Sequence, residues 1–436
     1  MDKQPHHIKG VTMLCLVIVA TGGVIGWLLS RSSEIAEVYT VRPIASGSMA
    51  NAAPGPHLQI QCHDCGIAYR CDVTTVGEDH LPVCYNCGAI NSIEGSRGHT
   101  GQVAYAAGPI RRWSKVVFTA PEAAGDQGML LKRIVALPGE QLGFVDGDLW
   151  INGARYQKSL SEFDLLQVPV FDSQHRPRDS QHSFLDRFAV GINEQAWLIT
   201  TAGEFAFDAP EHKSQQWLEY IHWNVIAGFV PQVRRGSPDA ILDYHPYNQY
   251  ISRPQLHFVD DYVVDLWVTT HTAPAFQFRL LDVNVTVDCG GHTVSVSQGA
   301  RHCGQQSIDE TTVPLKQPWK IRVGRLDGRV VVQINSQQWA FDFEPTLPTG
   351  NYIDDRLLRQ RPFAVAASEG ILDIKRILIA RDIYWLAPNG MDNSWQFSSE
   401  LPPDSFFLVG DNQPVSRDSR HWNQGIHRSL IQGVVP

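Results

Sequence analysis

The sequence predicts a mainly β protein that is divided into several domains. At 436 residues the chain is too long for one ordinary hydrophobic core, and a soft average of about 150 residues per domain suggests two or three. The 35 Gly, 26 Pro and 12 Trp favour short strands joined by turns over a helical bundle. Apolar and polar residues also alternate with a period of two along many segments, which is the pattern of half-buried strands.

The charge balance indicates which partners to expect. The formal charge of -9 comes with no long basic run, so the sequence offers no phosphate-binding face. Nucleic acid is therefore not an expected partner.

The N-terminal segment contains an uncharged run long enough to cross a membrane. Residues 10–30 carry no charge, and a helix needs roughly 20 residues to span the hydrocarbon of a bilayer. Trp27 lies where an interfacial anchor is expected, whereas a cleavable signal peptide, the competing interpretation, usually has an apolar core of about 7 to 15 residues. We expect residues 1–31 to form a short tail and a transmembrane anchor. Because Lys3 and Lys9 precede the run, the positive-inside rule favours a cytoplasmic N-terminus with the rest of the chain outside the membrane.

Four cysteines form two Cys-x-x-Cys motifs, each followed directly by a glycine. They are Cys62, Cys65, Cys84 and Cys87. Two such knuckles can place four thiolates at the corners of a tetrahedron, the geometry that structural zinc prefers, so we expect a zinc ribbon over residues 61–95. Two disulfides are the alternative, because a domain outside the membrane lies in an oxidising compartment. Cys71 fits neither arrangement, and Cys289 and Cys303 are candidates either for a disulfide or for two unpaired buried thiols.

Residues 96–155 have the pattern of short strands joined by turns. The expected strands span 102–105, 115–120, 132–136, 141–144 and 149–152. Asp146-Gly147 separates the last two strands, and this dipeptide is typical of a tight hairpin because its glycine tolerates a positive φ.

The middle of the chain, residues 156–388, begins irregularly and then becomes strongly periodic. Between residues 156 and 253 no repeat or motif stands out, and we predict no site there. The expected strands further on span 262–268, 276–280, 283–287, 320–325, 330–335, 339–343, 363–367 and 371–380. Asp327-Gly328 marks a second hairpin, and the whole pattern predicts an inserted antiparallel β-sandwich, or jelly roll. The runs RVGRLDGRVVVQIN, PFAVAASEG and RILIARDIYW resemble laminin-G or concanavalin-like folds, which implies a glycan as a candidate ligand, although no calcium or sugar constellation stands out.

Ser48 is a candidate nucleophile because a later segment offers it a base. A serine hydroxyl reacts poorly at neutral pH unless a neighbouring group takes its proton. Lys132 lies among apolar strand residues, and desolvation lowers the pKa of an amine towards the range of a general base. The 17 histidines leave a Ser/His/Asp triad open by composition, but no histidine lies in a comparable motif. Arg133 stays charged in any surroundings, so we expect it at the surface or beside a carboxylate.

Three motifs around these residues resemble, in the same order, the conserved boxes of the bacterial signal peptidase I family. They are SGSM at 46–49, KRIVALPGE at 132–140 and GDNQPVSRDSRHW at 410–422. Arg111-Arg112-Trp113 begins a stretch similar to a fourth, non-catalytic box, and an N-terminal anchor is also typical of this family. The resemblance covers roughly residues 40–155 and 395–436, with the large insertion between them.

The resemblance implies a role for each matching residue. Ser48 would be the nucleophile, Lys132 the general base and Ser416 the residue that orients Lys132. Ser46 would donate its hydroxyl to the oxyanion hole together with the backbone N–H of Ser48, and such donors are worth about 3 kcal/mol each in well-studied proteases. The supporting residues would be Asp411, Asp418 and Arg420, the last two as an ion pair. No cofactor is implied for catalysis.

The family resemblance also implies a function and a location. The chain would be a membrane-anchored Ser/Lys endopeptidase that removes signal peptides from exported preproteins at the outer face of the cytoplasmic membrane. Its partners would be signal peptides and the lipid bilayer, and its signal-peptidase-type β core would consist of residues 40–60, 96–155 and 395–436.

Two departures from the family pattern lie beside the proposed site. Ala50-Asn51 stands where the family continues with Pro-Thr, and Gln413-Pro414-Val415 stands where the family has charged and amide residues. Neither departure removes a chemical group from the Ser/Lys pair. The alternative hypothesis is a catalytically retired homologue that acts as a surface-displayed glycan-binding protein.

Overall fold

The computed structural model describes most of the chain after residue 38. The described residues are 39–50, 52–125, 128–178, 187–190, 196–200, 204–209, 215–223, 225, 238–249, 256–345, 352–367 and 370–436. Two compact units are distinguished, Met1–Thr40 and Val41–Pro436. The predicted transmembrane run, residues 10–30, lies outside the described residues, and within the described ranges no helix is both long enough and apolar enough to cross a membrane.

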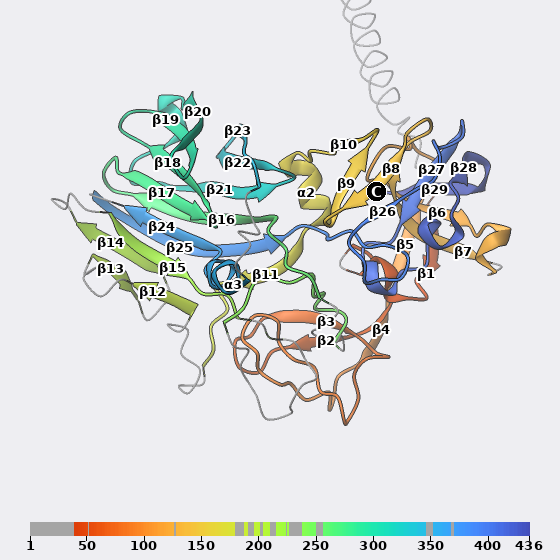
Figure 1. Cartoon of the computed structure of the whole chain (residues 1–436). Coiled ribbons are helices and arrows are strands. Elements are labelled where there is room, and N and C mark those ends of the chain that lie inside the picture. The colour runs from red at the N-terminus through yellow and green to blue at the C-terminus, as the bar shows by residue number, and fades with distance from the viewer. Residues whose placement is uncertain are drawn as a thin grey trace, which may run out of the picture. The chain divides into compact units, whose positions relative to one another are not determined.

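Two antiparallel sheets form a β-sandwich in the middle of the chain (Figure 1). One sheet has the order β13 (Trp197–Ile199), β14 (Phe205–Ala209), β25 (Gly370–Arg381), β16 (Tyr262–Thr270), β21 (Pro318–Leu326), β22 (Arg329–Ile334) and β23 (Gln337–Asp342), with β11 (Val168–Asp172) also paired to β25. The other has the order β12 (Phe188–Val190), β15 (Gln216–Tyr220), β24 (Phe363–Ala367), β17 (Ala275–Leu280), β18 (Val283–Asp288), β19 (Thr293–Gln298) and β20 (Arg301–Ser307). The mainly β fold class and the sandwich are therefore as predicted.

The core of the sandwich follows directly from the alternation in the sequence. In β17 the side chains of Phe276, Phe278 and Leu280 are buried, while Gln277 and Arg279 between them are partly exposed. The buried side chains of both sheets join one hydrophobic cluster, so each sheet covers the apolar face of the other. Asp327 and Gly328 both have positive φ, 51° and 77°, as a two-residue hairpin turn requires.

Two smaller sheets join segments that are far apart in the sequence. The first has the order β28 (Ile426–His427), β27 (Ser405–Val409), β7 (Met129–Ala136), β6 (Lys115–Thr119) and β29 (Ile431–Val435). The second has the order β10 (Ala154–Arg155), β9 (Asp148–Ile151), β8 (Leu142–Val145) and β26 (Trp395–Gln396). The C-terminal segment thus pairs with strands that precede the sandwich, which brings the second and third sequence motifs into one region.

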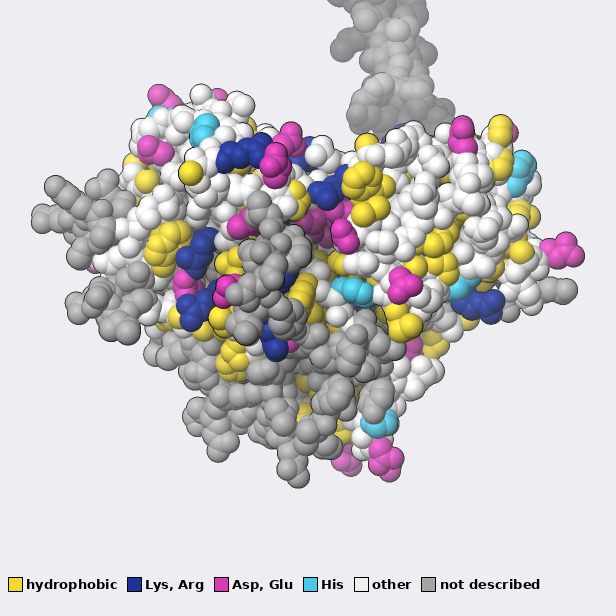
Figure 2. Space-filling view, viewed as in Figure 1, with side chains coloured by type: hydrophobic (Ala, Val, Ile, Leu, Met, Phe, Trp, Pro, Cys, Tyr) yellow, Lys and Arg dark blue, Asp and Glu magenta, His cyan; other side chains and the backbone are white. Residues whose placement is uncertain are grey.

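The remaining elements are short. Strands β2 (Pro56–Gln61), β3 (Ala68–Asp72) and β4 (Gly98–Thr100) form a sheet that carries the cysteine motifs, and β1 (Thr40–Pro43) pairs with β5 (Gln102–Tyr105). The helices are α2 (Leu160–Leu166), α3 (Tyr352–Gln360) and α4 (Ser419–Trp422), with 3-10 turns η1 (Gly47–Met49), η2 (Glu122–Ala124), η5 (Glu310–Thr312), η6 (Gln413–Val415) and η7 (Arg428–Leu430). On the face shown in Figure 2, Lys and Arg side chains lie among Asp and Glu side chains.

A fully buried lysine links the β10 end of the second small sheet to the sandwich. Lys158 is 0% exposed, its Nζ contacts Asp327, and it lies 2.9 Å from Asp382 Oδ2. Asp327 lies in the β21–β22 turn and Asp382 directly follows β25. Burial alone would lower the pKa of Lys158, but the charges of Asp327, Asp382 and Asp148 together outweigh it and raise that pKa above its ordinary value. The lysine is therefore charged and acts as the counter-ion of a buried acidic cluster.

Replacing Lys158 by methionine should destabilise the fold severely. The substitution would leave Asp327 and Asp382 buried without their cation, a change that typically costs about 3–5 kcal/mol. Lys375→Met is the matched control, because Lys375 forms an exposed ion pair with Glu204 and such pairs are worth at most about 1 kcal/mol. Denaturant unfolding of both variants measures the difference, and equal stabilities would show that the buried cluster does not need Lys158.

Candidate active site

Ser48 lies in the 3-10 turn η1 and its side chain is almost completely buried. Ser46 precedes this turn in extended conformation, and its Oγ lies 3.3 Å from Ser48 Oγ. The carbonyl oxygen of Ser48 accepts a hydrogen bond from the backbone N–H of Asn412 at 3.0 Å. The structure thus places the first and third sequence motifs in direct contact.

Lys132 approaches Ser48 from the centre of the first small sheet. It belongs to β7, which lies between β27 and β6, and its Nζ lies 2.6 Å from Ser48 Oγ. The side chain is only 4% exposed, and burial is the main reason why its pKa is lowered to about 8. The charge of Asp418 opposes this shift and that of Arg420 adds to it. A lysine with this pKa is substantially neutral near pH 8, so its amine can accept a proton.

Asp418 and Arg420 form a buried ion pair behind this contact. The Arg420 Nε and Nη2 donate to the two carboxylate oxygens of Asp418, each at 2.8 Å. Burial by itself would raise the pKa of Asp418, but the charge and hydrogen bonds of Arg420 outweigh it and lower that pKa below its ordinary value. Gln413, one of the departures from the family pattern, accepts a hydrogen bond from Arg420 Nη1 at 2.7 Å, so it belongs to the same network.

Ser416 makes a different contact from the one that the family resemblance implies. Its Oγ donates to Asp418 Oδ2 at 2.7 Å, and the structure gives no hydrogen bond between Ser416 and Lys132. Ser416 nevertheless lies close to Ser48, because a Cβ on Gly410 would meet both Ser416 Oγ at 2.2 Å and the Ser48 carbonyl oxygen at 2.5 Å. Only glycine fits at position 410 in this arrangement.

Arg133 and Asp411 form a second ion pair, which shares no residue with the Asp418–Arg420 pair. Its Nε and Nη2 donate to the two carboxylate oxygens of Asp411 at 2.7 and 2.6 Å, and its Nη1 donates to the Trp113 carbonyl at 2.8 Å. Arg133 is 1% exposed, so the carboxylate partner expected from the sequence is present and the surface location is not. This pair joins β7 to the loop after β27.

The four cysteines of the Cys-x-x-Cys motifs converge on one point. All four sulfur atoms lie within 4.8 Å of one another, with Cys62 3.5 Å from Cys87 and Cys65 3.6 Å from Cys84. Sulfur atoms bound to one zinc ion at about 2.3 Å in a tetrahedron lie about 3.8 Å apart, so the spacing suits a structural metal. The thiols are free, which the disulfide alternative does not allow. Gly66 and Gly88, directly after the two motifs, both have positive φ.

The other described cysteines do not form disulfides. Cys71 is a buried thiol whose pKa is raised to about 12 by burial. The suggested pairing of Cys289 and Cys303 is not present, since both are free. Cys289 directly follows β18 and Cys303 lies in β20, and β19 separates these strands. Two strand spacings amount to about 10 Å, whereas the Cα atoms of a disulfide lie within about 7 Å of each other.

Residues 243–249 pack against the turn that carries Ser48, and no sequence motif pointed to them. We predicted no site between residues 156 and 253, but Asn248 exchanges hydrogen bonds with Asn412. A Cβ on Gly47 would lie 2.3 Å from the Tyr247 ring, so this segment packs directly on η1. The run Asp243-Tyr244-His245-Pro246-Tyr247-Asn248-Gln249, which is unusually rich in hydrogen-bonding side chains, was the available signal.

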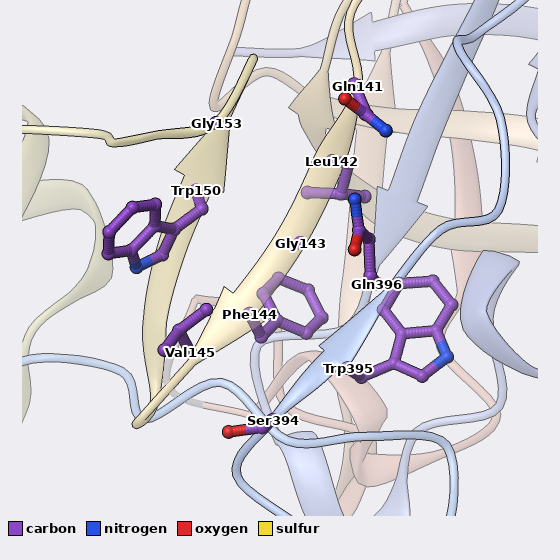
Figure 3. Close-up of a pocket in the computed structure, with 10 residues that line it drawn as sticks. All are labelled: Gln141, Leu142, Gly143, Phe144, Val145, Trp150, Gly153, Ser394, Trp395 and Gln396. Carbon is purple, nitrogen blue, oxygen red and sulfur yellow. The ribbon is translucent and has the colours of Figure 1, made fainter.

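A pocket of about 410 Å³ lies on the second small sheet, apart from Ser48 and Lys132. Gly143 of β8 lies between its two sides, which are formed by Trp150 of β9 and by Trp395 and Gln396 of β26 (Figure 3). None of the residues predicted as catalytic lines it.

The comparison with protein families supports part of the predicted resemblance. Residues 92–188 match the family of signal peptidases, peptidase S26. The matched stretch contains Lys132 and Arg133, while Ser48 and the C-terminal motif lie outside it. No curated protein matches the chain.

Solved structures match the chain only loosely. A carbohydrate-binding module from Bacillus subtilis has 7% identity and a TM-score of 0.27, with 44% of this chain and 94% of that chain covered. A Bacillus subtilis protein of unknown function with a galectin-like fold has 7% identity and a TM-score of 0.30, with coverage of 49% and 97%. A laminarinase catalytic domain from Thermotoga maritima has 9% identity and a TM-score of 0.29, with coverage of 50% and 98%.

Proposed function

We propose that the chain is a membrane-anchored serine endopeptidase of the signal peptidase I type, which removes signal peptides from exported preproteins. The contact between Lys132 Nζ and Ser48 Oγ, at 2.6 Å, is the observation that carries this proposal. It supplies a nucleophile and a base within hydrogen-bonding distance, and burial has already lowered the pKa of the base. Residues 10–30 would anchor the chain in the cytoplasmic membrane, with the catalytic unit outside and close to emerging preproteins.

The proposed reaction needs only groups of this chain and a water molecule. Neutral Lys132 takes the proton of Ser48 Oγ as that oxygen attacks the scissile carbonyl carbon. The backbone N–H of Ser48 and the hydroxyl of Ser46 stabilise the resulting oxyanion. The lysine ammonium then protonates the leaving amine, and the peptide bond breaks to give an acyl-enzyme. Lys132 next takes a proton from water, whose oxygen attacks the ester, and the proton returns to Ser48 as the acid product leaves.

Cleavage of a preprotein by the full chain in detergent tests this function. Mass spectrometry should find one product pair, with the cut directly after the signal peptide. The alternative function, a retired peptidase whose sandwich binds glycans, predicts that the preprotein stays intact while the chain is fully folded. An intact preprotein with a folded enzyme would therefore overturn the proposal.

We also propose that the four-cysteine cluster holds a structural zinc ion. Purified protein should contain about one zinc per chain, and Cys84→Ser should lose it. Because zinc binding in such sites supplies about 10–16 kcal/mol of folding free energy, a strong chelator should unfold the ribbon. Cys71→Ser is the matched control, since Cys71 lies outside the cluster and should leave the zinc content unchanged. Two disulfides and no metal in the purified protein would contradict the zinc site.

A further inference from the structure

We propose that residues 243–249, from the insertion, position the nucleophile loop, residues 46–50, and that Asn248 is the positioning residue. The proposal rests on the proposed peptidase function and adds a part of the machinery that none of the three sequence motifs contains.

Asn248 and Asn412 form a closed pair of hydrogen bonds inside the protein. Asn248 Nδ2 donates to Asn412 Oδ1 at 2.6 Å, and Asn412 Nδ2 donates to Asn248 Oδ1 at 2.8 Å. Both residues are buried, Asn412 completely. Two amides joined in this way have one favoured relative orientation, so Asn248 fixes the rotation of the Asn412 side chain.

Asn412 transmits that orientation to the backbone of the nucleophile loop. Its Nδ2 also donates to the carbonyl oxygen of Gly47 at 2.9 Å, and its backbone N–H donates to the carbonyl oxygen of Ser48 at 3.0 Å. The peptide bond is planar, so the Gly47 carbonyl and the Ser48 N–H belong to one rigid plane and point in opposite directions. Holding the Gly47 carbonyl therefore aims the Ser48 N–H, which is the proposed oxyanion donor.

Two residues close to Asn248 in the sequence, Tyr247 and His245, pack against the same loop. The Tyr247 ring occupies the space that a side chain at Gly47 would need, and the Tyr247 hydroxyl donates to the Pro56 carbonyl at 2.9 Å. His245 is buried beside the backbone of Ala50. Burial, with a smaller effect from Arg381, lowers the pKa of His245 to about 3, so its ring stays neutral where the enzyme would work. The segment thus packs against the loop at Gly47 and at Ala50, on either side of Ser48.

The sandwich and the cysteine-bearing unit hold this segment in place. Arg381, at the end of β25, donates from Nη2 to the carbonyl oxygens of Asp243 and Tyr244, each at 2.8 Å. The side-chain oxygen of Gln249 accepts from the Val83 N–H at 2.7 Å, and the Tyr247 carbonyl accepts from the Asp72 N–H at 3.0 Å. These hydrogen bonds fix the position of residues 243–249, and through them the insertion restrains the backbone around Ser48.

The test measures kcat and KM for preprotein cleavage in Asn248→Ala and Asn248→Leu. Leucine keeps the volume of the asparagine side chain but removes both hydrogen bonds to Asn412, whereas alanine also leaves a cavity. Equal losses of kcat in the two variants would therefore be due to the lost hydrogen bonds and not to the cavity. We expect kcat to fall by about 10- to 100-fold, because a misaimed oxyanion donor loses transition-state stabilisation, while KM stays within about threefold. The pH at which the rate rises should not move, since neither amide titrates. Asn284→Ala, on the partly exposed side of β18, is the matched control and should behave like the wild type.

A double-mutant cycle with Asn412→Ala tests the route. If Asn248 acts through Asn412, Asn248→Ala should cause no further loss of kcat in the Asn412→Ala background. If the kcat losses of the two single variants multiply in the double variant, Asn248 does not act through Asn412. If Asn248→Ala and Asn248→Leu both keep the wild-type kcat, Asn248 is not a positioning residue. A loss that appears only as a lower thermal midpoint, with kcat per folded molecule unchanged, would show a purely structural role and would also overturn it. If the wild-type chain itself fails to cleave, the proposed function falls first, and this outcome is distinct from all the others.

Discussion

Ser48→Ala should lower kcat/KM for preprotein cleavage by about 10⁴-fold or more. The variant lacks the Ser48 hydroxyl, whose oxygen lies 2.6 Å from Lys132 Nζ. Without that oxygen no acyl-enzyme can form at position 48. Removing the nucleophile of a comparable serine protease costs about 10⁶-fold in kcat. The measurement is a single-turnover cleavage assay with enzyme in excess over preprotein, followed by quantification of the mature product.

The fold should tolerate the loss of the Ser48 hydroxyl. Ser48 contributes its carbonyl oxygen to the contact with Asn412, and alanine retains that group. The thermal midpoint of Ser48→Ala should therefore stay close to that of the wild type. Ser429→Ala, which changes an exposed serine beside His427, is the activity control. Cleavage by Ser48→Ala at a rate within tenfold of this control would rule out Ser48 as the nucleophile.

Lys132→Met should cause a loss of similar size for a different reason. Methionine keeps most of the apolar length of lysine, so β7 should still pack, but no amine remains to take the proton of Ser48 Oγ. Lys132→Arg is the more informative variant. Arginine keeps a positive charge but does not release its proton near pH 8, so it cannot serve as a base. If Lys132 acts as a base, both variants should be inactive in the same assay, whereas an active arginine variant would indicate that only the charge matters.

The regular parts of the fold were predictable from local pattern. Period-two alternation predicted β17 and β18, and the Asp-Gly dipeptides at 146–147 and 327–328 predicted the hairpins, because both signals lie within a few neighbouring residues. Strands β19 and β20 were missed because β19 offers only two buried side chains, Val294 and Val296, and β20 offers none. The pairing of β27 with β7 joins residues more than 250 positions apart, and only the order of the three motifs pointed to it.

The site residues that belong to a sequence motif could be predicted. The residues outside the motifs, which contact them from distant parts of the chain, could not. Ser48 and Lys132 were chosen as a pair from the sequence, and the structure places them together. Asn248 carries no signal of its own, because an asparagine in an irregular segment is ordinary until Asn412 is placed opposite it. The contact of Ser416 with Asp418 likewise depends on the exact path of the loop between them, which sequence spacing does not specify.

The pH dependence of kcat/KM reports the ionisation of the base in the free enzyme, and it therefore tests whether Lys132 is the base for Ser48. Burial lowers the pKa of Lys132 to about 8, and only the neutral amine can accept a proton. We expect kcat/KM to rise about tenfold per pH unit below pH 8 and to level off above it. A flat profile between pH 6 and 9, or a rise centred near 6.5 as for a histidine base, would contradict the Ser48/Lys132 mechanism.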